Sequence, residues 1–315
     1  MASTIYLVIP CYNEQEVLAE TTKRLKEKLS MLIDQKKISD KSKVVYVDDG
    51  SKDNTWNLIS YFHKEDKLFR GIKLSRNRGH QNALLAGLLS VKDEADAVIS
   101  MDSDLQDDIN AIDEFIKEYD ENGCDIVYGV RSSRGNDSAF KRGSAQGFYK
   151  MMGFLGAKIV YNHADYRLMS RRALDALEQF GEVNLFLRGM VTLLGFKTAT
   201  VEYVRGDRFA GKSKYPFRKM VSFAWDGITS FSVKPIKIIT MLGIIVILLG
   251  VAGLIYSLVS HLRGNTVAGW TSMMMSIWLL GGIQLISIGI IGEYIGKIYN
   301  ETKHRPRFIV EEYLK

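Results

Sequence analysis

Two carboxylates lie one residue apart in the segment MDSDLQD, directly after an apolar run. Asp102 and Asp104 at this spacing can converge on one divalent cation, and Gln106 offers a further oxygen. A bound Mg²⁺ or Mn²⁺ usually keeps water molecules and takes substrate phosphate oxygens as its remaining ligands. A bare pair of this kind is more often a solvated turn. The metal interpretation therefore depends on two further observations: the pair follows the end of a predicted buried strand, and other polar clusters are expected beside it.

A second acidic pair, Asp48 and Asp49, ends the apolar run of VDDGSKDNT. A carboxylate there can accept hydrogen bonds from a nucleobase imide or a ribose hydroxyl. The alternative is ordinary turn chemistry, because sharp turns favour Asp and Gly. The residues that end the first apolar run are expected to wall the same pocket. They are Pro10, Tyr12, Asn13 and Glu14.

Two basic segments offer cations for phosphate groups. RFAGKSKY contains Arg208, Ser213 and Lys214 in a glycine-containing loop suited to a diphosphate, since Arg offers a fork of donors and Lys a point charge. Attraction to anionic lipid headgroups explains it equally well, and both can hold. The other segment suits a lipid-borne phosphate, or is solvated charge. It contains Arg131, Arg134, Lys141 and Arg142.

Three further polar residues have less defined interpretations. Asp165 opens DYRLMSRR and looks exposed, and a cap or a salt bridge with Arg167 or Arg171 would explain it without catalysis. His80 and His163 are each isolated in the sequence, and nothing in the pattern makes them metal ligands.

A sheet must position these clusters. The runs TIYLVIP, KVVYVDD, RGIKLS, ADAVISMD and CDIVYGVR alternate with helical periodicity over residues 15–33, 54–65, 79–90 and 109–121. Near-continuous apolar strands alternating with helices predict a mostly parallel sheet covered on both faces. Ligands bind such sheets at the carboxyl ends of the strands, where the polar clusters fall.

The composition narrows the class of protein. The 315 residues are 46% hydrophobic and 25% charged, which excludes a disordered or collagen-like chain. The net charge of +6 is modest and scattered, so no nucleic-acid partner is expected. Cys11 and Cys124 cannot form a disulfide framework and are expected to be reduced thiols in a domain facing the cytoplasm.

Two uncharged apolar runs near the C-terminus predict transmembrane helices. Residues 238–259 and 270–292 contain 22 and 23 residues, enough to span a hydrocarbon core of about 30 Å. Two buried helices of a large soluble domain are the alternative. Lysines and arginines flank the pair, so both flanks are expected in the cytoplasm. The N-terminus runs straight into a strand pattern, which predicts no signal peptide.

An amphipathic helix is predicted just before the first span. Apolar residues recur at three- and four-residue steps from Phe217 to Phe231, a pattern typical of a helix in the membrane interface or of an ordinary helix facing a core. We therefore divide the chain into a cytoplasmic catalytic domain, an interfacial helix, a transmembrane hairpin and a cytoplasmic tail. Their predicted bounds are 1–215, 216–235, 236–292 and 293–315.

Taken together, these motifs resemble family-two, GT-A-type glycosyltransferases that load a sugar onto a polyisoprenyl phosphate. Such enzymes are the bactoprenol glucosyltransferases and the relatives of dolichol-phosphate mannose synthase. The resemblance covers nearly the whole chain. It rests on IPCYNE, VDDGSKDNT, LSRNRGHQNAL, MDSDLQD, DYRLMSR, RFAGKSKY and the two spans.

The resemblance implies an α/β GT-A fold, which is Rossmann-like, and a function for each cluster. The implied metal ligands are Asp102, Asp104 and Gln106. The implied nucleotide-sugar site consists of Pro10, Tyr12, Asn13, Glu14, Asp48, Asp49, Asp102 and Ser213. The implied catalytic residues are Asp104, Asp165, Arg208 and Lys214, and Arg131 and Arg142 would meet the acceptor phosphate.

Asp165 occupies the place where many inverting family members carry a catalytic base. A phosphate monoester has a second pKa of about 6, so such an acceptor is already mostly unprotonated at neutral pH. General-base catalysis contributes little when no proton must be removed. We therefore expect Asp165 to orient the acceptor or the metal shell, or to stabilise positive charge on the anomeric carbon.

The sequence thus predicts an inverting, Mg²⁺- or Mn²⁺-dependent transfer of a hexose, best assigned as glucose, from UDP to undecaprenyl phosphate at the cytoplasmic leaflet of the cell membrane. N-acetylglucosamine, galactose and GDP-mannose remain open as donors. A homo-oligomer and a separate flippase for the product are also expected. The alternatives are a non-catalytic membrane regulator that senses nucleotide-sugars, a processive polymer synthase and a nucleotidyltransferase.

Overall fold

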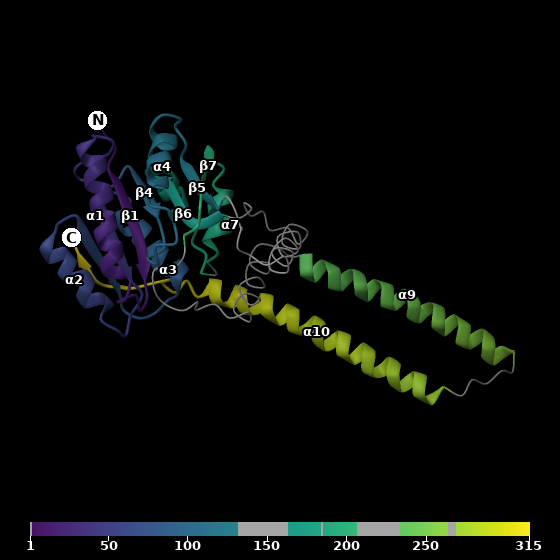
Figure 1. The fold of residues 1–315 in the computed structure, drawn as a ribbon. Helices are drawn as coiled ribbons and strands as arrows, with labels where there is room; N and C mark the ends of the chain where they lie inside the picture. Colours follow the sequence, from purple (N-terminus) through teal and green to yellow (C-terminus); the bar gives the residue numbers. More distant parts are fainter. Residues whose placement is uncertain (1, 132–162, 184, 207–233, 264–268) are drawn as a thin grey trace.

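The computed structural model describes residues 2–131, 163–183, 185–206, 234–263 and 269–315. An α/β domain forms most of this part of the chain, and two long helices project from it as an antiparallel hairpin (Figure 1). Cys11 and Cys124 are both free cysteines with buried side chains.

An eight-stranded sheet forms the centre of the domain, in the order β7-β5-β6-β4-β1-β2-β3-β8. The pairs that include β6 or β8 are antiparallel, and all the others are parallel, which confirms the predicted mostly parallel sheet. The strands are β1 (Ile5–Cys11), β2 (Lys43–Asp48), β3 (Phe69–Leu74), β4 (Ala97–Ser100), β5 (Ile126–Arg131), β6 (His163–Ser170), β7 (Thr198–Tyr203) and β8 (Val310–Leu314).

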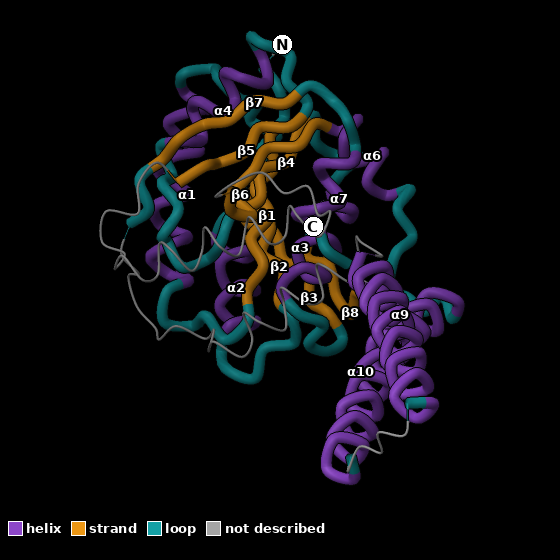
Figure 2. Tube along the Cα trace, turned by 90° about the vertical axis from the view of Figure 1, so that its right-hand side faces the viewer, coloured by secondary structure: helices purple, strands orange, loops and turns teal. Residues whose placement is uncertain are grey.

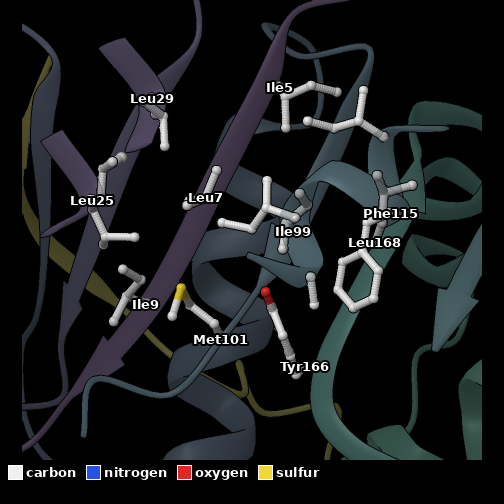
Figure 3. Packing of buried hydrophobic residues seen from close by; sticks show 14 of the residues in the cluster. Ile5, Leu7, Ile9, Leu25, Leu29, Ile99, Met101, Phe115, Tyr166 and Leu168 are labelled. Atoms are coloured by element: carbon white, nitrogen blue, oxygen red, sulfur yellow. The ribbon is translucent and has the colours of Figure 1, made fainter. Parts of the chain in front are cut away.

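Helices cover both faces of the sheet, because strand side chains alternate between two apolar layers. On β1, Ile5, Leu7 and Ile9 pack on one face with α1, α2 and α4, as Figure 3 shows in part, while Tyr6 and Val8 pack on the other with α3. The helices of the domain are α1 (Leu18–Asp34), α2 (Thr55–Glu65), α3 (His80–Val91), α4 (Ala111–Asp120), α6 (Arg171–Glu178) and α7 (Leu187–Leu193).

The helices of the hairpin are α9 (Lys234–Leu262) and α10 (Trp270–Thr302). Figure 2 shows them side by side and away from the sheet. In the described parts of the chain, no helix combines the length and apolar character needed to cross a membrane. The two transmembrane spans therefore stay a prediction. The predicted interfacial helix lies almost wholly in 207–233, outside the described residues.

The C-terminal residues, predicted as a tail from 293 onward, continue α10 to Thr302 and then form β8 at the sheet edge. β8 pairs antiparallel with β3. The sequence VEEYL carries two glutamates and shows no strong strand pattern, so only its pairing with β3 makes it a strand. β7 was likewise not predicted.

Polar contacts fix the base of the hairpin to the domain. The Glu301 carboxylate accepts two hydrogen bonds from the Val183 N–H, at 2.8 and 3.0 Å. Arg307 Nη1 donates to the Phe180 carbonyl at 2.9 Å, and Lys315 pairs with Glu94 at 3.2 Å. Because the segment from the end of α10 to β8 is attached at Glu301, Arg307 and Lys315, the base of α10 is fixed beside the sheet.

Gly50 provides a test of the loop after β2. Its φ of +65° is left-handed, and an added Cβ would lie 2.6 Å from the Asn77 nitrogen and 2.7 Å from the Arg76 carbonyl carbon. Gly50→Ala should lower the free energy of unfolding by at least about 1–2 kcal/mol, because backbone atoms must move. Denaturant titration measures this change. Gly181→Ala, with open space around it, is the control, and an equal effect in both variants would contradict the account.

Candidate active site

The carboxyl ends of β1, β2 and β4 meet at one edge of the sheet. Cys11 lies beside Asp48 in the register of β1 and β2, and the Met101 N–H donates to the Val8 carbonyl at 3.2 Å. The loops that follow these strands are also connected. Asn13 N–H donates to Ser51 Oγ at 3.0 Å, and Asn13 Oδ1 accepts from the Lys52 N–H at 2.8 Å. The structure thus brings together the three acidic or polar clusters that end these strands.

The acidic pair after β2 is buried and bonded to backbone. Asp48 accepts hydrogen bonds from the Ser51 N–H, at 3.3 Å to each oxygen. Asp49 accepts from the N–H groups of Arg78 and Gly79, at 2.7 and 2.9 Å, which fixes the segment that leads into α3. Burial raises the pKa of both carboxyls despite these bonds. Asp49 therefore fixes the backbone between β3 and α3 and is itself buried.

The loop after β4 carries Asp102 and Asp104 in a strained turn. Leu105 has a left-handed φ of +58° although it is not glycine, which costs about 1–2 kcal/mol. Strain of this kind concentrates at functional sites. The turn lets Asp104 Oδ1 accept from the Gln106 N–H at 3.2 Å. Gln106 itself is bonded through its side chain to the Gly206 carbonyl at 3.5 Å and to the Arg205 guanidinium.

Asp165 lies in β6 and contacts three cationic side chains. Arg167 Nη2 donates to Oδ1 at 2.8 Å, Arg188 donates from Nε and Nη2 at 3.2 and 3.0 Å, and His80 Nε2 lies 3.5 Å from Oδ2. The expectation that Asp165 is exposed is wrong, because its side chain is only 11% exposed. The predicted salt bridge to Arg167 is present, whereas Arg171 pairs with Asp93 instead.

Burial alone would raise the pKa of the Asp165 carboxyl. The charge of Arg188, the hydrogen bond from His80 and the charge of Arg167 hold that pKa well below its usual range. Burial would likewise lower the pKa of His80, but its hydrogen bond to Asp165 and the charges of Asp102 and Asp165 raise it to about 9. At neutral pH the site therefore holds an ionised Asp165 and a protonated His80.

His80 also joins Asp165 to the acidic loop after β4. Its Nε2 lies 3.7 Å from Asp102 Oδ1. Burial and the nearby charges of Asp165 and Asp104 raise the pKa of Asp102, and His80 opposes this rise. The carboxylates of Asp102 and Asp104 are thus close enough to repel each other, and a cation bound between them would relieve that repulsion.

A second network reaches the same loop from β5 and β7. Arg131 Nε donates to the Tyr203 hydroxyl at 3.4 Å, and that hydroxyl donates to Asp107 at 2.6 Å. Asp107 in turn accepts from the Asp102 N–H at 3.5 Å. Burial and the charge of Asp102 raise the pKa of Asp107 to about 6. The structure therefore brings Arg131, one of the two predicted acceptor-phosphate residues, to the edge of the acidic loop.

The donor set fits a hard divalent cation that shares its ligands with a substrate. Among the described residues, no group of three His, Cys, Asp or Glu side chains forms a complete metal site. Mg²⁺ commonly takes one or two carboxylates and completes its shell with water and substrate phosphates. Asp102 and Asp104 satisfy that requirement, with Gln106 next to them.

Four predicted site residues lie outside the described part of the chain: Arg142, Arg208, Ser213 and Lys214. Pro10 is buried in β1, and Tyr12 and Glu14 are partly buried beside the β2 loop. Glu14 N–H donates to Thr55 Oγ1 at 2.9 Å.

The sequence interpretation missed His80, Arg188 and Asp107. His80 is isolated in sequence and meets its two carboxylates only because α3 begins beside the ends of β4 and β6. Arg188 lies in a seven-residue helix with no polar motif around it. One local feature of the sequence marks this position. In the segment SRNRGH a glycine directly precedes His80, and in the structure that glycine has a φ of +87° and α3 begins after it.

The fold and the strand-end carboxylates define a GT-A-like α/β enzyme. Residues 6–178 match glycosyl transferase family 2, and residues 234–298 match the GtrB C-terminal hairpin. The chain belongs to glycosyl transferase family 2 and is a glycosyltransferase, which confirms the resemblance seen in the sequence.

Several relatives are similar to the chain over nearly its full length. An uncharacterized glycosyltransferase of Bacillus subtilis, YkoT, is 53% identical over 97% of this chain and 90% of its own. A bactoprenol glucosyl transferase of Shigella phage SfV is 40% identical over 98% of each chain. A prophage bactoprenol glucosyl transferase homolog of Escherichia coli is 39% identical over 99% of each chain.

Asp165→Asn tests the buried ion cluster. Arg167 is only 1% exposed, and no acceptor in the described chain bonds to its Nε or Nη1. Removing the carboxylate charge leaves Arg167 buried without its counter-ion, which should cost about 3–5 kcal/mol in the free energy of unfolding.

The matched control is Asp93→Asn, since Asp93 is 69% exposed and pairs with the exposed Arg171. That substitution should cost less than about 1 kcal/mol. Thermal or denaturant unfolding of both variants makes the comparison, and a similar small loss in the two would contradict a structural requirement for ionised Asp165.

Proposed function

We propose that the protein transfers glucose from UDP-glucose to undecaprenyl phosphate, with inversion at the anomeric carbon. The observation that carries this proposal is the 39–40% identity to bactoprenol glucosyl transferases over 98–99% of the chain. The strand-end site supports it, since carboxylates for a divalent cation lie at the same sheet edge as the polar residues that end β1 and β2. N-acetylglucosamine, galactose and GDP-mannose remain alternative donors.

Asp102, Asp104 and Gln106 would hold Mg²⁺ or Mn²⁺. When bound, the ion neutralises charge on the departing diphosphate. The nucleotide would lie against the residues that end β1 and β2, among them Tyr12, Asn13, Asp48 and Asp49. Pro10 and Glu14 would complete this wall.

We assign two further contacts to residues outside the described ranges. Arg208, Ser213 and Lys214 would bind the diphosphate and so complete the donor site. Arg142 would join Arg131 at the acceptor phosphate. Positioning and charge neutralisation are then the main sources of rate enhancement.

The hairpin is proposed as the membrane attachment, with the catalytic domain and both termini on the cytoplasmic side of the cell membrane. Its exposed apolar side chains support this assignment, because exposed apolar surface of this extent is unfavourable in water. They include Leu248 at 64%, Leu249 at 67%, Leu285 at 72% and Ile286 at 66% exposure. A homo-oligomer and a separate flippase for the product are part of the same proposal.

Another class of function is a non-catalytic membrane regulator that senses nucleotide-sugars. The carboxylates at the ends of β2 and β4 together with the cations around Asp165 favour an enzyme, because a non-catalytic protein need not keep every one of these clusters.

Transfer of labelled sugar tests the reaction. Purified full-length protein in detergent should convert one nucleotide-sugar and undecaprenyl phosphate to an organic-soluble product. Asp104→Ala and EDTA should each reduce the rate by about 10²-fold or more, since charge stabilisation of a leaving group is worth several kcal/mol.

Asp40→Ala, an exposed carboxylate in the loop before β2, is the control for this measurement. Full activity of Asp104→Ala in EDTA would contradict the metal assignment. UDP binding without any product from a panel of UDP- and GDP-sugars would favour the sensor.

Vesicle flotation tests the membrane attachment. The full-length chain should float with phospholipid vesicles at about 1 M salt, where charge attraction is screened over about 3 Å, because apolar burial would hold it. Release of the protein into the aqueous fraction at high salt would contradict a hairpin embedded in the bilayer.

A further inference from the structure

The geometry points to the cluster of Asp165, Arg167, Arg188 and His80 as the binding site for the phosphoryl group of the acceptor, with Asp165 as a positioning residue. This inference rests on the proposed function and adds to it a site on β6, α7 and α3. It adds these residues to Arg131 and Arg142, which the sequence suggested for the same phosphate.

The cluster carries more positive than negative charge. Two guanidinium groups, those of Arg167 and Arg188, contact one carboxylate at 2.8–3.2 Å, so the arginines alone leave an excess of one positive charge. Arginine is always protonated in proteins, so an excess of at least one positive charge remains at every pH. His80 Nε2 lies 3.5 Å from Asp165 Oδ2, the oxygen that also accepts from Arg188 Nη2.

Exposure shows which members of the cluster can meet a ligand. The side chains of Arg188 and His80 are 33% and 32% exposed, whereas those of Asp165 and Arg167 are 11% and 1% exposed. The carboxylate thus lies beneath Arg188 and His80. A ligand that approaches from solvent meets Arg188 and His80, and the 38% exposed Asp102 carboxylate lies 3.7 Å from His80. The part of this surface formed by Arg188 suits an anion.

The carboxylate also orients the arginine. Asp165 holds Arg188 through both Nε and Nη2, which fixes the plane of the guanidinium group. A guanidinium fixed in this way presents its outer edge in one direction and loses little side-chain entropy when it binds phosphate. Asp165 therefore acts through Arg188, not on the substrate itself.

The negative charge of the acceptor explains why Asp165 is paired with cations and not presented to the substrate as an unpaired carboxylate. A phosphate monoester is a dianion above a pKa of about 6 and would be repelled by a carboxylate acting alone. In the transfer, a phosphate oxygen forms the bond to the anomeric carbon. The bond from that carbon to the UDP oxygen breaks, and its electron pair leaves on UDP. No proton needs to move.

The same cations could in principle bind a phosphoryl group of the donor, so the experiment has two arms. One arm measures KM and kcat for undecaprenyl phosphate at saturating UDP-glucose, with full-length protein in detergent. The other arm measures the Kd of UDP by calorimetry. The variants are Arg188→Gln, Arg188→Lys, His80→Gln and, as a matched control, Arg171→Gln, in which an exposed arginine loses its bond to Asp93.

Arg188→Gln should raise the KM for undecaprenyl phosphate about 10- to 100-fold, the usual effect of losing one charged hydrogen bond. The Kd of UDP should stay within about twofold of the wild-type value. The KM of Arg188→Lys for undecaprenyl phosphate should lie between the values of the wild type and Arg188→Gln. Lysine keeps the positive charge but lacks the paired N–H donors of the guanidinium group. His80→Gln should raise the same KM less, and Arg171→Gln should change neither quantity.

Two results would overturn the inference. An unchanged acceptor KM with a lower kcat in Arg188→Gln would mean that the cluster does not bind the acceptor, and a weaker Kd of UDP would assign it to the donor. If Arg188→Gln fails to fold, Arg188→Lys and His80→Gln decide the same question. Failure of the proposed function is separate, since the wild-type protein would then form no lipid-linked sugar.

Discussion

An arginine buried in the middle of the sheet sets the arrangement of the site. Arg167 lies on β6 beside Ser100 of β4 and Tyr128 of β5, and a buried guanidinium needs a counter-ion. Asp165, two residues earlier on the same face of β6, provides it. Once ionised there, Asp165 attracts Arg188 from α7 and His80 from α3, and His80 extends the network to Asp102. Three elements far apart in the sequence are thus held around one carboxylate.

The two acidic parts of the site, the pair Asp102 and Asp104 after β4 and Asp165 on β6, lie in different electrostatic environments. The carboxylates after β4 repel each other and favour a cation shared with a diphosphate. Asp165 is surrounded by cations, and its low pKa makes it a weak base. Under the proposed function, donor and acceptor phosphates would therefore approach the same region without facing uncompensated negative charge. The hairpin, fixed to the domain through Glu301, Arg307 and β8, would place this region near a membrane surface that holds the acceptor.

Much of this was predictable from local sequence. Strands β1 to β5 and helices α1 to α4 follow from apolar runs and helical periodicity, and the rule for parallel sheets places Asp48 and Asp102 at one edge. β8 was not predictable, because its strand character comes from pairing with β3. Asp165 looked exposed because its burial comes from α3 and α7, which fold over β6. His80 and Arg188 have no motif of their own, and only the tertiary structure brings them together.

The measurement that tests this account most directly compares two acceptors that differ only in the phosphate group. Purified full-length protein would be given UDP-glucose with either undecaprenyl phosphate or undecaprenol, and the lipid products would be analysed by mass spectrometry. The account predicts a hexosyl product from the phosphate alone, because the cationic cluster binds an anion and Asp165 does not remove protons. Comparable transfer to undecaprenol would contradict it, since a hydroxyl acceptor needs a base.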